Sequence, residues 1–228
     1  AAATHKPIQY NEESFILTCG EQRVYLGNAY AYYCQAKSKE DRDRILTNLI
    51  APFSDNVSEI SLEDASPLIV AVVRERAMFS VGTLYWRLDG ADLDESKIAF
   101  EPISNWYSKA LVLDFPTHVR IVNKEDLERW NVSFEELFQI GLKRLAEATL
   151  PKFQAQDGYF VGTWKDDYDN SRVLLPSLFQ DLPIRGEPVM VTPNRLTLMV
   201  ADSANPSAVK AMLQRAEQIV QSEPRPQN

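Results

Sequence analysis

The chain has 228 residues, 45% of them hydrophobic and 25% charged, and a formal net charge of −8 at pH 7. This composition is that of an ordinary globular protein with one large domain or two small ones, and it excludes fibrous and intrinsically disordered proteins. The negative charge disfavours nucleic acid and anionic lipid as partners, and no apolar run approaches the ~20 residues of a membrane span. We therefore expect a soluble protein with no nucleic-acid partner and no membrane insertion.

The start of the chain and its two cysteines bear on the compartment. Residues 1–5 have neither the basic nor the apolar region of a leader peptide, which favours a cytoplasmic protein, although the absence of an initial Met leaves a removed leader open. Cys19 and Cys34 form no CxxC motif and have no His nearby in the sequence, so a structural zinc site is unsupported. We expect two buried thiols, with a single disulfide as the alternative for an exported protein.

Residues 1–104 are expected to form a mostly helical region, either as a separate domain or as part of one domain with residues 105–228. Residues 1–13 lack periodicity and predict a loose arm, and the apolar runs on either side of Gly20 predict a short hairpin. The boundary between the two regions is expected within residues 82–105, where an acidic turn separates apolar pieces.

Two helical segments are predicted within this first region. Apolar residues between Asn28 and Ile50 recur at helical spacing and predict one long or kinked helix that ends before Pro52, with a restart offered by Ser38. The second segment covers residues 61–73, but its end is β-branched, so a strand is the alternative there.

Paired strands with helices between them are predicted from residue 105 onward. Residues 110–113 and 119–122 flank a turn-forming segment and predict one hairpin, and residues 189–191 and 196–200 predict another. This order favours an α+β fold, a mainly antiparallel sheet with helices packed on one face, preceded by a more helical N-terminal half.

Helix-start signals mark three helices among these strands. Ser133 opens a capping box, and Gly141 within the following apolar stripe indicates that another backbone packs close, because Gly otherwise costs about 1 kcal/mol in a helix. Asp169 or Asn170 is expected to cap a short helix, and the last helix is expected to begin at Pro206 behind an Asn cap.

No catalytic template matches the sequence. The chain lacks the GxxxxGKS/T, GxGxxG, HExxH and GxSxG motifs. Its histidines, His5 and His118, are expected in an arm and at a strand entry, where a surface role is usual and a proton-transfer role for His118 is the less common alternative. The sequence thus leaves enzymatic activity open but leans against it, and we expect no cofactor.

The densest polar segment runs through residues 164–172. Asp167, Asp169 and Ser171 have the alternating oxygen spacing that opens a calcium loop, but Arg172 stands where such a loop needs Gly, so an EF-hand is excluded. A weaker magnesium or calcium site on Asp167 and Asp169 remains open. The simpler interpretation is an acidic loop that caps the helix following it.

A second candidate site is formed by Asn194 and Arg195 in the last hairpin turn. Turn chemistry with a solvated charge is the simplest interpretation. Alternatively, Arg195 forms an ion pair with the loop at Asp167 and Asp169, or binds an anionic group of a ligand through its planar guanidinium.

Trp164 belongs to a set of aromatic side chains beside acidic residues, which also suits a surface that binds a basic protein.

Several short motifs in the second half of the chain form a set, at residues 111–114, 127–137, 167–175 and 193–195. Through them residues 105–225 resemble the YtpQ-like family of bacterial proteins of unknown function, whereas the N-terminal half matches less well. The resemblance implies a bacterial cytoplasmic protein and brings no reaction with it. It also implies one site or one structural network for the polar residues at which the motifs coincide: Asp167, Ser171, Asn194 and Arg195.

The leading hypothesis from the sequence is a non-enzymatic protein that binds another protein, as an adaptor, a small chaperone or an immunity factor does. The alternative is a divalent-metal-dependent hydrolase or transferase, in which Asp167 and Asp169 hold the metal and Arg195 holds an anionic substrate. The residues expected to bind the ligand or partner are Asp167, Asp169, Ser171, Arg172, Asn194, Arg195 and Trp164.

Overall fold

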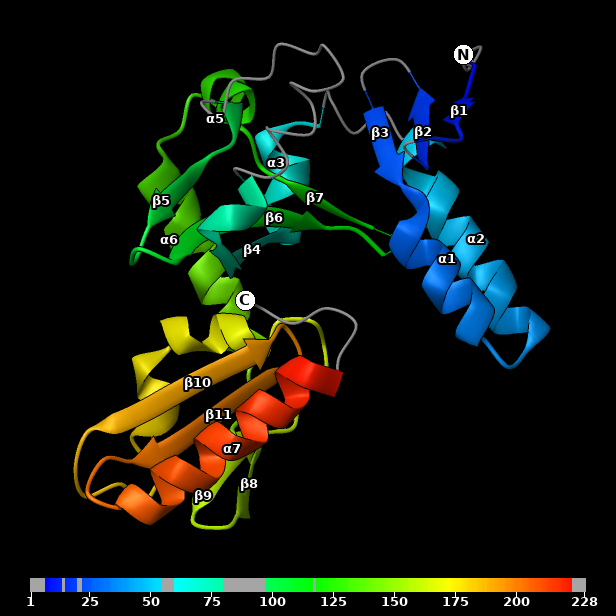
Figure 1. Ribbon diagram of the computed structural model, residues 1–228. Coiled ribbons are helices and arrows are strands. Elements are labelled where there is room, and N and C mark those ends of the chain that lie inside the picture. The colour runs from blue at the N-terminus through cyan, green and yellow to red at the C-terminus, as the bar shows by residue number, and fades with distance from the viewer. Residues whose placement is uncertain are drawn as a thin grey trace. The chain divides into compact units, whose positions relative to one another are not determined.

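Two compact units make up the protein, whose computed structural model is shown in Figure 1. Unit 1 comprises residues 1–65 and 114–120, and unit 2 comprises residues 66–113 and 121–228. Strands are paired antiparallel in both units, and helices accompany them, so the fold is α+β. The structure describes residues 7–13, 15–19, 22–54, 60–79, 97–116 and 118–222.

The domain division expected near residue 104 falls inside unit 2, and the acidic turn expected there, at residues 90–95, lies outside the described residues. The described part of the first 104 residues holds strands as well as helices, so the expected excess of helix in the N-terminal half is not clear.

Unit 1 contains a small sheet of order β1-β2-β3 and helices. The hairpin expected around Gly20 is confirmed by β2 and β3, and the loose arm is wrong for β1, which pairs with β2. The elements are β1 (Gln9–Asn11), β2 (Ile16–Cys19), β3 (Gln22–Tyr25), α1 (Leu26–Gln35), α2 (Lys39–Ser54) and α3 (Leu62–Ala65).

Helices α1 and α2 replace the long or kinked helix expected between Asn28 and Pro52. The chain restarts at Ser38, as its cap chemistry indicated: Ser38 Oγ accepts a hydrogen bond from Asp41 N at 3.0 Å and donates one to Asp41 Oδ2 at 2.8 Å. The expected end before Pro52 is wrong, because α2 continues to Ser54.

The first sheet of unit 2 has the order β4-β6-β5. Val122 N donates to Leu111 O at 2.9 Å, as the hairpin predicted from residues 110–113 and 119–122 requires. The elements in this part of the chain are β4 (Ile69–Glu75), β5 (Phe100–Pro102), β6 (Tyr107–Asp114), β7 (Val119–Ile121), α5 (Lys124–Trp130) and α6 (Phe134–Glu147).

The helix expected over residues 61–73 forms only at its start. Helix α3 ends at Ala65, the short 3-10 helix η2 (Ser66–Leu68) follows, and the strand alternative is confirmed by β4. β-branched side chains favour a strand where both faces are covered, and every residue of β4 before Glu75 is buried.

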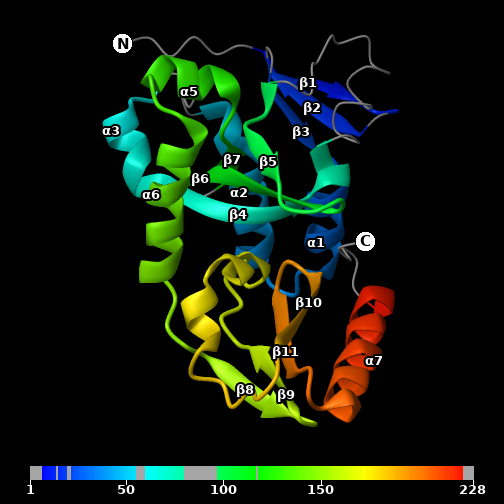
Figure 2. The ribbon, with the colours of Figure 1, turned by 90° about the vertical axis from the view of Figure 1, so that its left-hand side faces the viewer.

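Helix α6 lies across β4, as Figure 2 shows. Its capping box at Ser133 and Glu136 is confirmed. A Cβ atom added to Gly141 would lie 2.7 Å from Ala71 N and 3.1 Å from the carbonyl carbon of Val70. The close backbone approach expected at Gly141 is therefore confirmed, and the backbone belongs to β4.

The second sheet of unit 2 has the order β10-β11-β9-β8, and α7 lies along β10 and β11 (Figure 1). The hairpin predicted at residues 189–200 and the helix start at Pro206 are confirmed, with Asn205 Oδ1 accepting from Ala208 N at 3.2 Å. The elements are β8 (Phe153–Gln156), β9 (Tyr159–Gly162), η4 (Asn170–Leu174), η5 (Pro176–Phe179), β10 (Pro188–Asn194), β11 (Thr197–Asp202) and α7 (Pro206–Ser222).

The main core of unit 2 joins its two sheets, since Val70 and Val72 of β4 belong to the same cluster as Leu198 and Val200 of β11.

Among the described residues, no helix combines the length and the apolar character needed to cross a membrane. Cys34 is exposed and Cys19 only partly buried, and they form no disulfide, so the expectation of two buried thiols is wrong.

Replacing Gly141 by Ala is expected to lower the free energy of unfolding by about 1–3 kcal/mol, because the new methyl group meets the β4 backbone. Gly27 of α1 is the matched control, since nothing lies within 4 Å of the position that a Cβ atom would take there, and Ala should raise that free energy by up to about 1 kcal/mol. Urea denaturation of both variants measures the difference. Equal effects of the two substitutions would contradict the close packing of α6 on β4.

Candidate functional site

Arg172 is a fully buried cation within the predicted polar segment. Its Nη1 and Nη2 donate to the two carboxylate oxygens of Asp166 at 2.8 and 2.6 Å, and its Nε donates to Thr149 Oγ1 at 3.0 Å. The guanidinium carbon lies 4.5 Å from the centre of the Trp164 ring. All three guanidinium nitrogens of Arg172 thus have partners, and a bidentate ion pair of this kind fixes the loop rather than a ligand.

The other polar residues of the segment bind backbone groups. The Asp169 carboxylate accepts hydrogen bonds from Lys165 N and Asp166 N, both at 3.3 Å, and burial raises its pKa. Its side chain does not cap η4, so a cap on the following helix is wrong for Asp169. Asn170 does not cap η4 either: it is the first residue of η4, its Oδ1 accepts from Ser171 Oγ at 3.2 Å, and its Nδ2 donates to Val73 O at 3.2 Å.

Ser171 bonds the outer edge of β4 at Val73. Its Oγ accepts from Val73 N at 3.1 Å, beside the bond from Asn170 to Val73 O. Since β4 is the outer strand of its sheet, these two side chains satisfy backbone groups that would otherwise be exposed at a sheet edge. The segment therefore ties η4 to β4.

Asn194 and Arg195, at the turn between β10 and β11, lie next to η4. Asn194 is buried and its Oδ1 accepts from Leu196 N at 3.0 Å. Arg195 O accepts from Asn170 N at 3.3 Å, and Arg195 Nη2 lies 3.5 Å from Met78 Sδ. The sequence left open an ion pair between this loop and Arg195; the bidentate ion pair that the loop forms joins Asp166 to Arg172.

Arg74, near the end of β4, is a buried cation that the sequence analysis did not single out. The residue is 7% exposed, and among the described residues its guanidinium donates one hydrogen bond, from Nη1 to Val73 O at 2.8 Å. Burial and the positive charge of Arg195 lower the pKa of Arg74 to about 10, whereas Tyr168 and Asp167 act weakly in the opposite direction. The backbone of Arg195 is tied to this end of β4, because its carbonyl accepts from Asn170 N and the Asn170 side chain donates to Val73 O.

Two polar atoms near the end of β4 are buried and have no hydrogen-bond partner among the residues that the structure describes, Glu75 Oε1 and Ser108 Oγ. Ser108 of β6 is directly opposite Arg74 in the antiparallel register, so both side chains project from the same face of the sheet. Burial raises the pKa of Glu75, and the charge of Arg195 opposes this shift. The buried polar atoms that have no hydrogen-bond partner among the described residues therefore include two near the end of β4 and none in the loop at residues 164–172.

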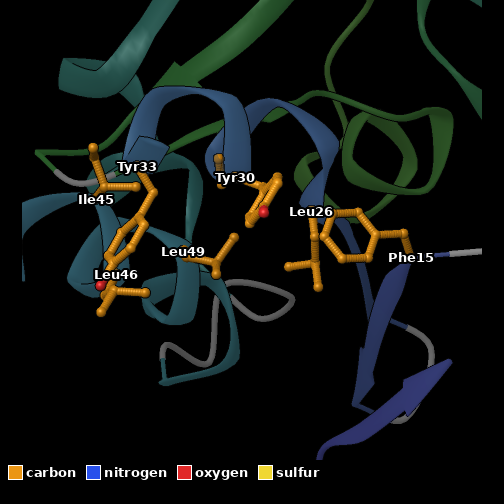
Figure 3. Close-up of a pocket in the computed structure, with 8 residues that line it drawn as sticks. Phe15, Leu26, Tyr30, Tyr33, Ile45, Leu46 and Leu49 are labelled. Atoms are coloured by element: carbon orange, nitrogen blue, oxygen red, sulfur yellow. The ribbon is translucent and has the colours of Figure 1, made fainter. Parts of the chain in front are cut away.

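An apolar groove lies on the helices of unit 1 (Figure 3). Its volume is about 240 Å³, and the side chains that line it are apolar except for two Tyr hydroxyls. Phe15 meets Tyr30 edge-on, with 5.7 Å between the ring centres, and Leu46 stands across the groove with 46% of its surface exposed. The lining residues are Phe15, Leu26, Ala29, Tyr30, Tyr33, Ile45, Leu46 and Leu49.

The part of the chain that the structure describes contains no group of three or more His, Cys, Asp or Glu side chains that could hold a metal ion. Asp166 is bonded to Arg172, and Asp169 to the backbone of its own loop. His118 stacks on Phe115, with 4.7 Å between the ring centres.

Sequence reasoning singled out the polar segment and Arg195 but missed Arg74 and the groove. The signal for Arg74 is a cation directly after the buried run of β4, which looks like an ordinary strand end. The signal for the groove is the helical spacing of Tyr30, Tyr33 and Leu46, which is equally typical of a core-facing stripe.

A comparison with protein-family models found no match, and neither did comparisons with curated proteins and with solved structures.

Replacing Asp166 by Asn is expected to lower the free energy of unfolding by about 1.5–3 kcal/mol, the size of charge-assisted hydrogen bonds. The loss is smaller than for a fully buried pair because the Asp166 side chain is 42% exposed. Urea denaturation at neutral pH measures it. The control is Asp167→Asn in the same exposed stretch, for which a change below about 0.5 kcal/mol is expected.

The same variant carries a pH signature. Although burial acts to raise the pKa of Asp166, the hydrogen bonds and charge of Arg172 outweigh it and hold the pKa below its ordinary value. The stability that Asp166 contributes is therefore complete above the unfolded pKa of about 3.9 and is lost as the pH falls through the lower folded pKa. We expect the wild type and Asp166→Asn to converge in stability at low pH; a gap that stays constant would contradict the ion pair.

Proposed function

We propose that this protein is a non-enzymatic binding module whose unit 1 groove takes an amphipathic helix of another protein. The observation that supports this proposal most directly is the apolar lining of the groove together with its exposure: Tyr30 is 60% exposed and Leu46 46% exposed. Large apolar side chains grouped at a hollow are typical of protein-binding surfaces, whereas scattered ones are not.

The size of the groove favours side chains over a whole metabolite. Pockets for small molecules usually enclose about 300–1,000 Å³ and carry several polar groups that orient the ligand. This groove, at about 240 Å³ with almost no polar lining, is smaller and less specific for polar groups. It suits the insertion of apolar side chains from a partner.

The arrangement of the lining favours a helical partner. Leu26, Tyr30 and Tyr33 recur along one face of α1, and Ile45, Leu46 and Leu49 lie on one face of α2. Two packed helices that expose adjoining apolar stripes form the surface on which a third amphipathic helix docks.

The charge of the protein favours a partner with a basic polar face. The formal net charge of −8 attracts cationic partners and speeds their encounter, although it adds less to the affinity itself. We further propose, from the motifs of the second half, that the chain is a YtpQ-like cytoplasmic protein, which assigns it no reaction.

Replacing Leu46 by Glu is expected to weaken the binding of groove ligands by at least about tenfold, or about 1.4 kcal/mol, because a charge would enter an apolar contact. The ligands are amphipathic helical peptides selected from a displayed library, in which basic and acidic polar faces are equally represented. Fluorescence anisotropy measures the affinities. We expect the selected peptides to repeat apolar residues at helical spacing and to carry basic polar faces.

The matched control is Ile140→Glu, an exposed aliphatic residue on α6 of unit 2, which should leave peptide binding unchanged. Circular dichroism of both variants checks that they fold. Peptides that bind Leu46→Glu as tightly as the wild type would exclude the groove as their site. A dimer in light scattering that dissociates on Leu46→Glu would instead assign the groove to a second copy of the chain and contradict the proposal.

A further inference from the structure

Two buried arginines in unit 2 differ sharply in how their charges are satisfied. Arg172 bonds Asp166 and Thr149 through all its guanidinium nitrogens. Arg74, although 7% exposed, has one hydrogen bond to a backbone carbonyl, and in the described residues no carboxylate lies within ion-pair distance of it. A buried charge without an ionic partner is costly, so donors of this kind favour binding an anion.

Arg195 adds a second cation to the same place. Its backbone carbonyl accepts from Asn170 N, and the Asn170 side chain donates to Val73 O, the carbonyl that also accepts from Arg74. This chain of hydrogen bonds fixes the position of the Arg195 backbone relative to Arg74. The Arg195 residue is exposed, whereas Arg74 is buried.

The face of the sheet from which Arg74 projects carries a further polar group. Ser108 is fully buried, its Oγ finds no hydrogen-bond partner in the described part of the chain, and it is opposite Arg74 in the pairing of β4 with β6. A hydroxyl and a guanidinium on one face offer neighbouring donors to a bound oxyanion.

We propose that Arg74 and Arg195, with Ser108, form a binding site for the oxyanion group of a small molecule, a phosphate or a carboxylate. Two guanidinium groups match the planar, bidentate geometry with which Arg binds such groups. The site lies in unit 2 and is separate from the groove proposed for a protein partner, so either proposal can fail while the other stands.

Within the described ranges of the chain, no acidic side chain forms an ion pair with Arg74. Asp167 offsets less of the shift in the pKa of Arg74 than Arg195 causes. Glu75 follows Arg74 directly in β4, so its side chain projects from the opposite face of the strand.

The experiment is a titration of the full chain with inorganic phosphate and, separately, with acetate, at constant ionic strength kept with sodium chloride. Thermal unfolding is the readout, because a ligand that binds the folded state raises the melting temperature in a saturable way. We expect saturable stabilisation by at least one of the two anions. Phosphate acting alone assigns the site to phosphorylated ligands, and acetate acting alone assigns it to carboxylates.

Two variants and one control show whether the anion binds at the proposed site. Arg195→Ala, at an exposed position, should weaken anion binding by at least about tenfold without loss of fold, whereas Arg185→Ala, an exposed arginine elsewhere in unit 2, should have no effect. Arg74→Met should abolish the response and leave the melting temperature without anion unchanged or higher, because it removes a buried charge that has no ionic partner.

The proposal is overturned if neither anion gives a saturable shift, or if the shift survives both Arg195→Ala and Arg74→Met. It is also overturned if Arg74→Met destabilises the protein as strongly as Arg172→Met does, because Arg74 would then be a structural residue like Arg172.

Discussion

The bonding of strand β4 on all its sides is the constraint on which unit 2 depends. Its residues pair with β6 along the whole strand, and its outer edge is closed at Val73 by side chains of η4. Helix α6 packs so closely on its backbone that position 141 accommodates Gly and little else. Val70 and Val72 enter the core shared with β11. Because β4 is fixed in this way, the backbone position of Arg74 near its end is fixed as well.

The cost of burying a charge explains how the polar residues of unit 2 divide their roles. Arg172 is buried and contacts a carboxylate, a hydroxyl and an aromatic ring. The polar loop at residues 164–172 therefore stabilises the fold through these contacts. Arg74 is buried too, but its guanidinium bonds a backbone carbonyl alone within the described ranges, and on this we base the proposal that it binds an anion. Unit 1 offers the opposite chemistry, an apolar groove beside Tyr30 and Leu46.

Much of the local structure was predictable, because its signals act within a few residues. The capping box at Ser133, the start of α7 at Pro206 and the last hairpin were all predicted from turn and cap chemistry. Helix α5 carries the same kind of capping box, between Asn123 and Asp126, and could have been predicted in the same way. Gly141 even indicated a close contact, though not with which strand.

The sequence by itself determined the α+β class, the caps, the turns and the acidic balance, since each depends on neighbours in the chain or on composition alone. Only the tertiary structure decided that residues 69–73 form a strand, that Arg172 pairs with Asp166, and that Arg74 is buried. Val73 and Ser171, whose bond ties β4 to η4, are 98 residues apart in the chain. Burial and hydrogen-bond partners at such separations depend on how the elements pack, and no local pattern of residues encodes that.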